Sequence, residues 1–119
     1  MSPGKPQLEQ AFPSITTAGK NPTVRCILKG SVVSHHVLSW YRQIKGTEIQ
    51  FLVSHRERSS PTYGDGIAHR FIPELLPLSN AFTLTIGNVE KADEGIYYCT
   101  IWFSNKYLFG EGTEIKVQG

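Results

Sequence analysis

The sequence predicts an all-β fold built as a sandwich of two packed sheets. Short stretches that alternate between apolar and polar residues recur along the chain, and segments rich in glycine, proline, serine and asparagine separate them. No stretch shows the period of a helix for longer than one turn. The chain has 119 residues, which is the length of one domain with its own core.

Six stretches have the pattern of strands. In chain order they are Thr23–Leu28, Val37–Gln43, Glu48–Val53, Ala81–Ile86, Gly95–Thr100 and Thr113–Val117. Within the first, Val24, Cys26 and Leu28 share one face, as expected of a half-buried strand. Gly110 and Gly112, just before the last strand, bracket an expected bulge.

The chain has two cysteines, Cys26 and Cys99. Two cysteines in a chain of this length are compatible with free thiols, a metal pair or one disulfide. Their wide separation favours the disulfide, and a disulfide indicates an oxidising compartment.

Trp40 between the cysteines, and the stretches Asp93–Cys99 and Phe109–Gly112, complete a pattern that resembles immunoglobulin variable-type (V-type) domains. The resemblance implies a two-sheet sandwich with one disulfide between the sheets, Cys26 to Cys99, against which Trp40 packs. The framework of such a domain holds its loops in position, so we expect function in the loops.

The same resemblance implies two further framework contacts. The hydroxyl of Tyr97 would bond back to the chain just upstream. Arg70 is expected to pair with Asp93; the alternative is two solvated charges, worth about 0–1 kcal/mol if paired. The remaining irregular segments, expected to be three loops at one end of the domain, are Gly30–His36, Ser54–Asp65 and Ile101–Leu108.

The framework between these loops resembles the variable domain of T-cell receptor gamma chains. The matching stretches are Leu8–Gln10, Trp40–Arg42, Ile49–Ser54, Leu84–Ile86, Asn88–Lys91 and Phe109–Thr113. The resemblance implies an antigen-receptor domain that pairs with a delta-like variable domain and recognises a cell-surface ligand through three loops. Two alternatives remain: a non-rearranging adhesion or co-receptor module of V type, or another antigen-receptor chain, either alpha/beta-like or an antibody light chain.

The resemblance also implies that the partner domain packs on the outward side of the sheet that contains Trp40. The residues expected at this interface are Tyr41, Gln43, Ile49, Phe51, Tyr98 and Phe109. An exposed cluster of aromatic and aliphatic side chains favours an interface, because it would promote aggregation of a monomer. The alternative is that Ile49 and Phe51 fold under the sheet edge.

The loops supply the residues that we expect to contact ligand. They are His35, His36, His55, Arg56 and Arg58 in the first two loops, and Trp102, Phe103, Ser104, Asn105, Lys106 and Tyr107 in the third. Aromatic side chains provide contact area at low entropy cost, and short polar ones adapt their hydrogen bonds. Trp102 has two alternative roles, as a ligand anchor or as a contact with the partner domain. The basic second loop suits an acidic ligand surface, although such charges are commonly only solvated.

The sequence gives no support for an enzyme, a cofactor or a metal site. It has no Gly-x-Ser-x-Gly elbow, phosphate-binding loop or His-Glu-x-x-His motif. His35 and His36 are adjacent, so they point apart in an extended chain, and no further ligand stands at metal-binding spacing. A net charge of +2 is too small to indicate nucleic acid or an anionic membrane as a partner.

We divide the chain into an N-terminal tail at residues 1–7, partly vector-derived, and a variable domain at residues 8–119. The tail lacks the apolar region of a secretory signal, and no apolar stretch approaches the length of a membrane span. We therefore expect an extracellular piece of a cell-surface chain, which reaches the membrane only through segments outside this sequence.

Two features depart from the gamma-chain pattern. Some gamma chains engage butyrophilin-type ligands through charged groups on the outer sheet face, where this chain has Thr23, Ile72 and Gly87. That binding mode is therefore not expected here. The segment Arg70–Asn80 is unusually apolar for a solvent-facing strand, which leaves two alternatives, a further contact site or a hydrophobic edge protected by its prolines.

Overall fold

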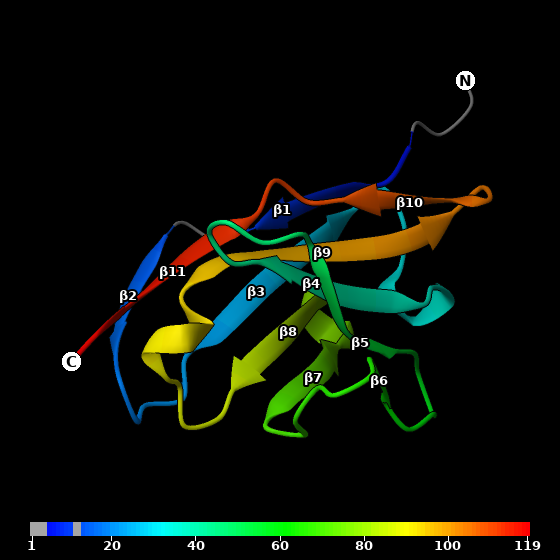
Figure 1. The fold of residues 1–119 in the computed structure, drawn as a ribbon. Helices are drawn as coiled ribbons and strands as arrows, with labels where there is room; N and C mark the ends of the chain where they lie inside the picture. The colour runs from blue at the N-terminus through cyan, green and yellow to red at the C-terminus, as the bar shows by residue number, and fades with distance from the viewer. Residues whose placement is uncertain (1–4, 11–12) are drawn as a thin grey trace.

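A computed structural model describes residues 5–10 and 13–119, and its strands form two facing sheets (Figure 1). The four-stranded sheet has the strand order β1-β3-β8-β7. Its members are β1 (Gln7–Gln10), β3 (Thr23–Lys29), β8 (Ala81–Ile86) and β7 (Phe71–Leu76). This order places the early strands β1 and β3 beside the late strands β8 and β7, so the sheet brings together segments that are distant in the sequence.

The seven-stranded sheet has the order β2-β11-β9-β4-β5-β6, and β10 also pairs with β9. Its members are β2 (Ser14–Thr17), β11 (Thr113–Gln118), β9 (Gly95–Phe103), β4 (Leu38–Gln43), β5 (Gln50–His55), β6 (Thr62–Tyr63) and β10 (Lys106–Phe109). Three single 3-10 turns interrupt the strands: η1 (Val33–His35), η2 (Pro77–Ser79) and η3 (Lys91–Asp93). In Figure 1 the β9–β10 turn lies at one end of the molecule and the C-terminus at the other.

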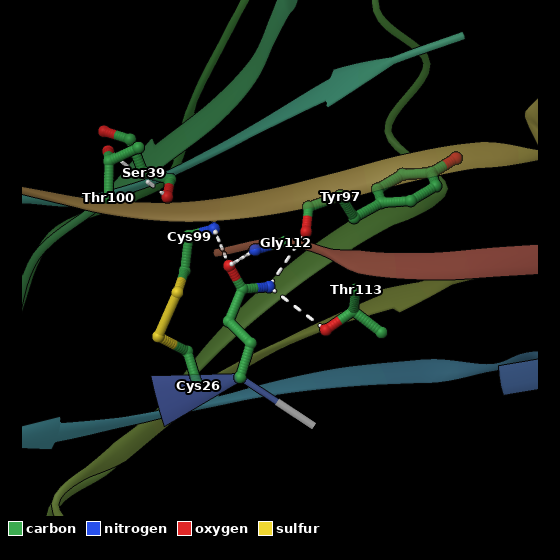
Figure 2. The surroundings of a disulfide bond; sticks show 8 residues. Cys26, Ser39, Tyr97, Cys99, Thr100, Gly112 and Thr113 are labelled. Carbon is green, nitrogen blue, oxygen red and sulfur yellow. Dashed lines mark hydrogen bonds between the residues drawn. A yellow bond between two sulfur atoms is a disulfide. The ribbon is translucent and has the colours of Figure 1, made fainter. Parts of the chain in front are cut away.

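The core confirms the expected sandwich. A disulfide joins Cys26 on β3 to Cys99 on β9 and so links the two sheets (Figure 2). Trp40 is 1% exposed and lies opposite Cys99 in the β4–β9 ladder. Its ring centroid is 5.4 Å from that of Phe82 in the other sheet. In the chain-entropy model, a loop of 73 residues closed by a disulfide contributes about 4 kcal/mol to stability.

The prediction that Ile101–Leu108 is an irregular loop is wrong. Strand β9 continues to Phe103 and β10 begins at Lys106, so most of the segment is a hairpin. Ser104 and Asn105 form its turn, with φ values of 52° and 63°, the sign that a type I′ hairpin turn requires. The run of β-branched and aromatic residues from Thr100 to Phe103 was the available signal for a strand.

The second predicted strand, Val37–Gln43, matches β4 except for its first residue, whereas the third, Glu48–Val53, begins and ends two residues before β5. Gly110 and Gly112 lie in the connection between β10 and β11. Gly112 has a φ of 96°, and a Cβ at Gly110 would lie 2.8 Å from the Cys99 sulfur, so both positions favour glycine.

The apolar segment Arg70–Asn80 is not simply a solvent-facing strand. It contains β7, an edge strand in which Phe71 and Pro73 are buried and Leu75 packs against the core, so these apolar residues face the interior of the sandwich. Pro73 suits an edge strand because it lacks one hydrogen-bond donor. Ile72 remains 50% exposed and Leu78 fully exposed.

Candidate functional site

An aromatic cluster covers the outward side of the seven-stranded sheet. We call it the aromatic face, and its members are Tyr41, Phe51, Tyr98, Trp102, Tyr107 and Phe109. Tyr41 lies at its centre, because β4 places it opposite Tyr98 on β9 and Phe51 on β5. The Tyr41 ring centroid lies 5.3 Å from that of Phe51, 5.4 Å from Phe109 and 6.4 Å from Tyr107.

The aromatic face is packed but open to solvent. Trp102, Tyr107 and Phe109 are each exposed over nearly half of their surface, and the other three members are half-buried. Burial raises the pKa of the Tyr41 phenol, and the neighbouring Tyr107 raises it further. The Tyr41 hydroxyl at the centre of the face therefore stays protonated at neutral pH.

The two non-aromatic residues predicted for the interface, Gln43 and Ile49, lie at the two ends of the connection between β4 and β5. Ile49 is 47% exposed, so it does not fold under the sheet edge. Gln43 is also exposed, and its Nε2 donates to the carbonyl oxygen of Thr47 at 3.3 Å.

The hairpin that replaces the predicted third loop is continuous with the aromatic face. Trp102 and Tyr107 are opposite each other in the β9–β10 ladder, and their rings meet edge to face at 4.9 Å. Phe103 lies instead against the core, with its ring centroid 6.4 Å from that of His36. Ser104, Asn105 and Lys106, in contrast, are exposed at the tip.

His36 holds the first loop against this hairpin. Its Nδ1 donates to the Trp102 carbonyl oxygen at 3.4 Å, and its Nε2 then accepts from the Ser31 hydroxyl at 2.7 Å. His36 is half-buried, whereas the adjacent His35 is exposed. The predicted pair thus differs in placement: His36 is bonded within the domain, and His35 faces solvent.

Asn80, which the sequence analysis did not identify, fixes the base of the first loop. Its Oδ1 accepts from the Val33 N–H at 2.9 Å, and its Nδ2 donates to the carbonyl oxygens of Leu28 at 2.8 Å and Ser31 at 2.7 Å. Asn80 has a φ of 49°, a conformation in which asparagine is enriched. An asparagine directly after a Pro-Leu-Ser turn was the available signal.

The second loop presents its charges to solvent. His55 is half-buried, and its Nε2 donates to the Ser59 carbonyl oxygen at 3.0 Å. Arg56, Glu57 and Arg58 are all exposed. Within residues 5–10 and 13–119, neither arginine of this loop forms an ion pair.

The opposite end of the sandwich has a buried charge network that confirms the predicted pairing of Arg70 with Asp93. The two side chains form two hydrogen bonds of 2.8 Å, and the Asp93 side chain is 2% exposed. Arg42 adds a third bond to the same carboxylate at 2.9 Å, a contact that the sequence analysis missed. The Tyr97 hydroxyl donates to the Asp93 carbonyl oxygen at 2.6 Å, as the resemblance implied.

Opposing effects act on the Asp93 carboxyl. Burial alone would raise its pKa, but the hydrogen bonds from Arg70, from the Glu90 N–H and from Arg42 together hold its pKa below the ordinary value. The carboxylate therefore stays ionised in the folded domain at neutral pH.

Gln10 is a second framework residue that the sequence analysis did not single out. Its Nε2 donates to the Tyr97 carbonyl oxygen at 2.8 Å and to the Thr113 hydroxyl at 3.2 Å. Its Oε1 accepts from the N–H groups of Gly112 at 2.8 Å and Cys99 at 3.3 Å, and Figure 2 marks these bonds beside the disulfide. One side chain thus joins β1 to β9 and to the start of β11.

In the part of the chain that the structure describes, no helix is long and apolar enough to cross a membrane. The family profile described as the immunoglobulin V-set domain matches residues 13–118. Over 114 residues the chain is 32% identical to the Ig kappa chain V region K-25 of the rabbit, Oryctolagus cuniculus. It is 33% identical to the rabbit Ig kappa chain V region 120, and each comparison covers 95% of this chain and 98% of the relative. The chain therefore belongs to the immunoglobulin V-set family.

Proposed function

We propose that the chain is an antigen-receptor variable domain of the T-cell receptor gamma type. In this proposal it pairs with a delta-like variable domain through the aromatic face and recognises a cell-surface ligand through its loops. It acts as a binding module without catalytic chemistry or a cofactor.

The observation that carries the proposal is the aromatic face. Six aromatic rings lie on one side of one sheet, and Trp102, Tyr107 and Phe109 keep nearly half of their surface exposed. Aromatic residues are enriched in protein interfaces, and a contiguous apolar surface of this kind is unfavourable in water. Tyr107 and Trp102 extend the face into the β9–β10 hairpin, which favours the partner-contact role for Trp102 over the role of a ligand anchor.

The gamma-type assignment rests on the framework stretches that resemble gamma chains, among them Ile49–Ser54 and Asn88–Lys91. A second candidate is an antibody light-chain variable domain, and the similarity to two rabbit kappa V regions favours it. The two candidates differ in the partner: a delta-like domain for the first, and a heavy-chain variable domain for the second.

Light scattering after size-exclusion chromatography tests both candidates. The chain is mixed with delta, alpha, beta and heavy-chain variable domains in separate runs. We expect a one-to-one complex with a delta domain. A complex only with a heavy-chain domain would support the light-chain candidate, and a monomer in every mixture would favour an adhesion or co-receptor module.

A pair of charge substitutions locates the pairing surface. Phe109→Glu places a carboxylate in the aromatic face and is expected to abolish the complex. Ile72→Glu is the matched control, because Ile72 is 50% exposed and Phe109 48%, but Ile72 lies on the other sheet. Both variants should keep the melting temperature within a few degrees. Equal loss of pairing in the two variants would contradict the assignment of the face.

A further inference from the structure

Two adjoining hollows lie between the first and second loops, and Val37 and Arg56 line both of them. The larger has a volume of about 440 Å³, and its polar lining includes the hydroxyl side chains of Ser54, Ser59, Ser60 and Thr62. The smaller has a volume of about 200 Å³, and His35 contributes to its lining. We call the two hollows together the Arg56 groove.

The backbone beside the Arg56 groove is held in place. The Arg56 carbonyl oxygen accepts from the Ser59 N–H at 3.3 Å and from the Ser59 hydroxyl at 2.9 Å. His55 closes the same turn by donating to the Ser59 carbonyl oxygen. Arg56 therefore projects from a fixed turn, which lowers the entropy cost of binding a ligand there.

The Arg56 guanidinium has no acidic partner and no hydrogen bond within the described residues. Such a group has its five donors available to a ligand. Among the described residues that line the larger hollow, Arg56 is the only arginine, lysine, aspartate or glutamate, so this hollow has one fixed positive charge. Glu57 lines only the smaller hollow, and Arg58 lines neither. The single positive charge matches an anion with one negative charge better than a phosphate with two.

We propose that the Arg56 groove binds one carboxylate from an acidic side chain of a protein ligand. A planar guanidinium donates two parallel hydrogen bonds to a carboxylate, and the hydroxyls of Ser54, Ser60 and Thr62 can donate to the remaining lone pairs, whereas the Ser59 hydroxyl already donates to the Arg56 carbonyl oxygen. Val37 offers an apolar wall for the methylene groups of the acidic side chain. The groove would thus bind a defined chemical group of the ligand in the proposed function. Only the statement that the ligand is a protein rests on that function.

A titration of the domain alone tests the inference. Sodium acetate, methyl sulfate and inorganic phosphate are added in separate nuclear magnetic resonance experiments at matched ionic strength, with sodium chloride as the reference. Acetate is expected to give saturable shifts of the Arg56 side-chain N–H and of the Ser59 and Thr62 amides. If chloride gives the same shifts, the effect is general screening and the inference is wrong. If methyl sulfate or phosphate binds more tightly than acetate, the carboxylate assignment is wrong.

Two substitutions of equal charge change make the test specific. Arg56→Gln should weaken acetate binding by about tenfold or more, because a charge-assisted hydrogen bond is lost. Arg25→Gln, at an exposed position on β3 of the other sheet, should leave acetate binding unchanged. Equal affinity for acetate in Arg56→Gln and the unsubstituted domain would overturn the inference.

The outcome is separable from that of the pairing experiment. A domain that pairs with a delta partner but shows no site-specific acetate response overturns only the groove. A domain that binds acetate at Arg56 but pairs with no receptor domain retains the groove and contradicts the proposed receptor.

Discussion

Arg42 and Arg70 at one end of the sandwich share the buried carboxylate of Asp93, whereas Arg56 and Arg58 in the second loop have no acidic partner among the described residues. Phe71 packs beneath the first pair, with its ring centroid 5.1 Å from the Arg42 guanidinium carbon and 4.8 Å from that of Arg70. Arginine therefore stabilises the fold at one end of the domain, whereas the arginines at the other end remain available for binding. This contrast separates the residues whose loss should unfold the domain from those whose loss should change only its contacts.

The largest expected effect is at Asp93. Asp93→Asn should lower the free energy of unfolding by about 3 kcal/mol or more, because it removes the buried counter-charge of two partly buried guanidinium groups and leaves Arg70 only the exposed Glu90, at 3.8 Å. Urea unfolding measures the loss. The matched control is Glu57→Gln in the second loop, which should change stability by no more than about 0.5 kcal/mol. Similar losses in the two variants would remove the contrast between the two ends.

The ionisation of the same carboxylate should make the stability of the domain depend on pH. The pKa of Asp93 is lower in the folded domain than the value of about 3.9 in an unfolded chain. Its contribution is therefore fully present above about pH 4 and is lost as the pH falls through the folded-state pKa. Thermal melts between pH 2 and pH 7 should show the advantage of the unsubstituted domain over Asp93→Asn shrinking in acid. A constant difference would contradict the role of the charge.

A smaller effect is expected at Gln10. Gln10→Ala removes four hydrogen bonds next to the disulfide and should cost about 2 kcal/mol, since it leaves buried backbone groups without partners. Gln7→Ala, at an exposed position on the same strand, is the control and should be nearly neutral. Chemical denaturation of both variants distinguishes a specific role of Gln10 from a general effect of shortening a glutamine in β1.

The smallest effect is expected at Arg56. Arg56→Gln should change the free energy of unfolding by less than about 0.5 kcal/mol, because an exposed arginine without an ion pair contributes little. Calorimetry compares it with Arg42→Gln, which should be clearly destabilised. Equal melting temperatures of these two variants would mean that the buried network contributes no more than a solvated charge.

The comparison also explains which parts of the molecule could be predicted from the sequence. The disulfide, the buried Trp40 and the Arg70–Asp93 pair were implied by the resemblance to V-type domains, which rests on residue types at characteristic spacings. Arg42 and Arg56 look alike in the sequence, and only the folded structure brings the first within reach of a buried carboxylate. Local pattern therefore identified the framework, whereas the distribution of charge depends on tertiary contacts.

The other differences between the predictions and the structure also arise from contacts between segments that are distant in the sequence, or from turn geometry. Gln10 stands in a strand with no motif around its side chain, and its four partners come from segments far along the chain. The third loop was predicted as irregular because Ser104 and Asn105 do not form one of the strongest hairpin-turn sequences, although asparagine tolerates the required φ. The groove beside Arg56 depends on how two separate loops approach each other, which the order of residues within either loop does not determine.

The two-residue turn at Ser104 and Asn105 constrains how this segment can differ between related V-set domains. Successive residues of a strand face opposite sides, so a slip of β10 by one residue would turn Tyr107 away from Tyr41. An insertion of one residue must therefore be absorbed as a bulge or a longer turn, or else it exchanges the two sides of the strand. Changes of sequence at the tip leave the pairing geometry intact, whereas changes of length alter it. Length variation in this hairpin is thus expected to alter the aromatic face as well as the tip of the hairpin.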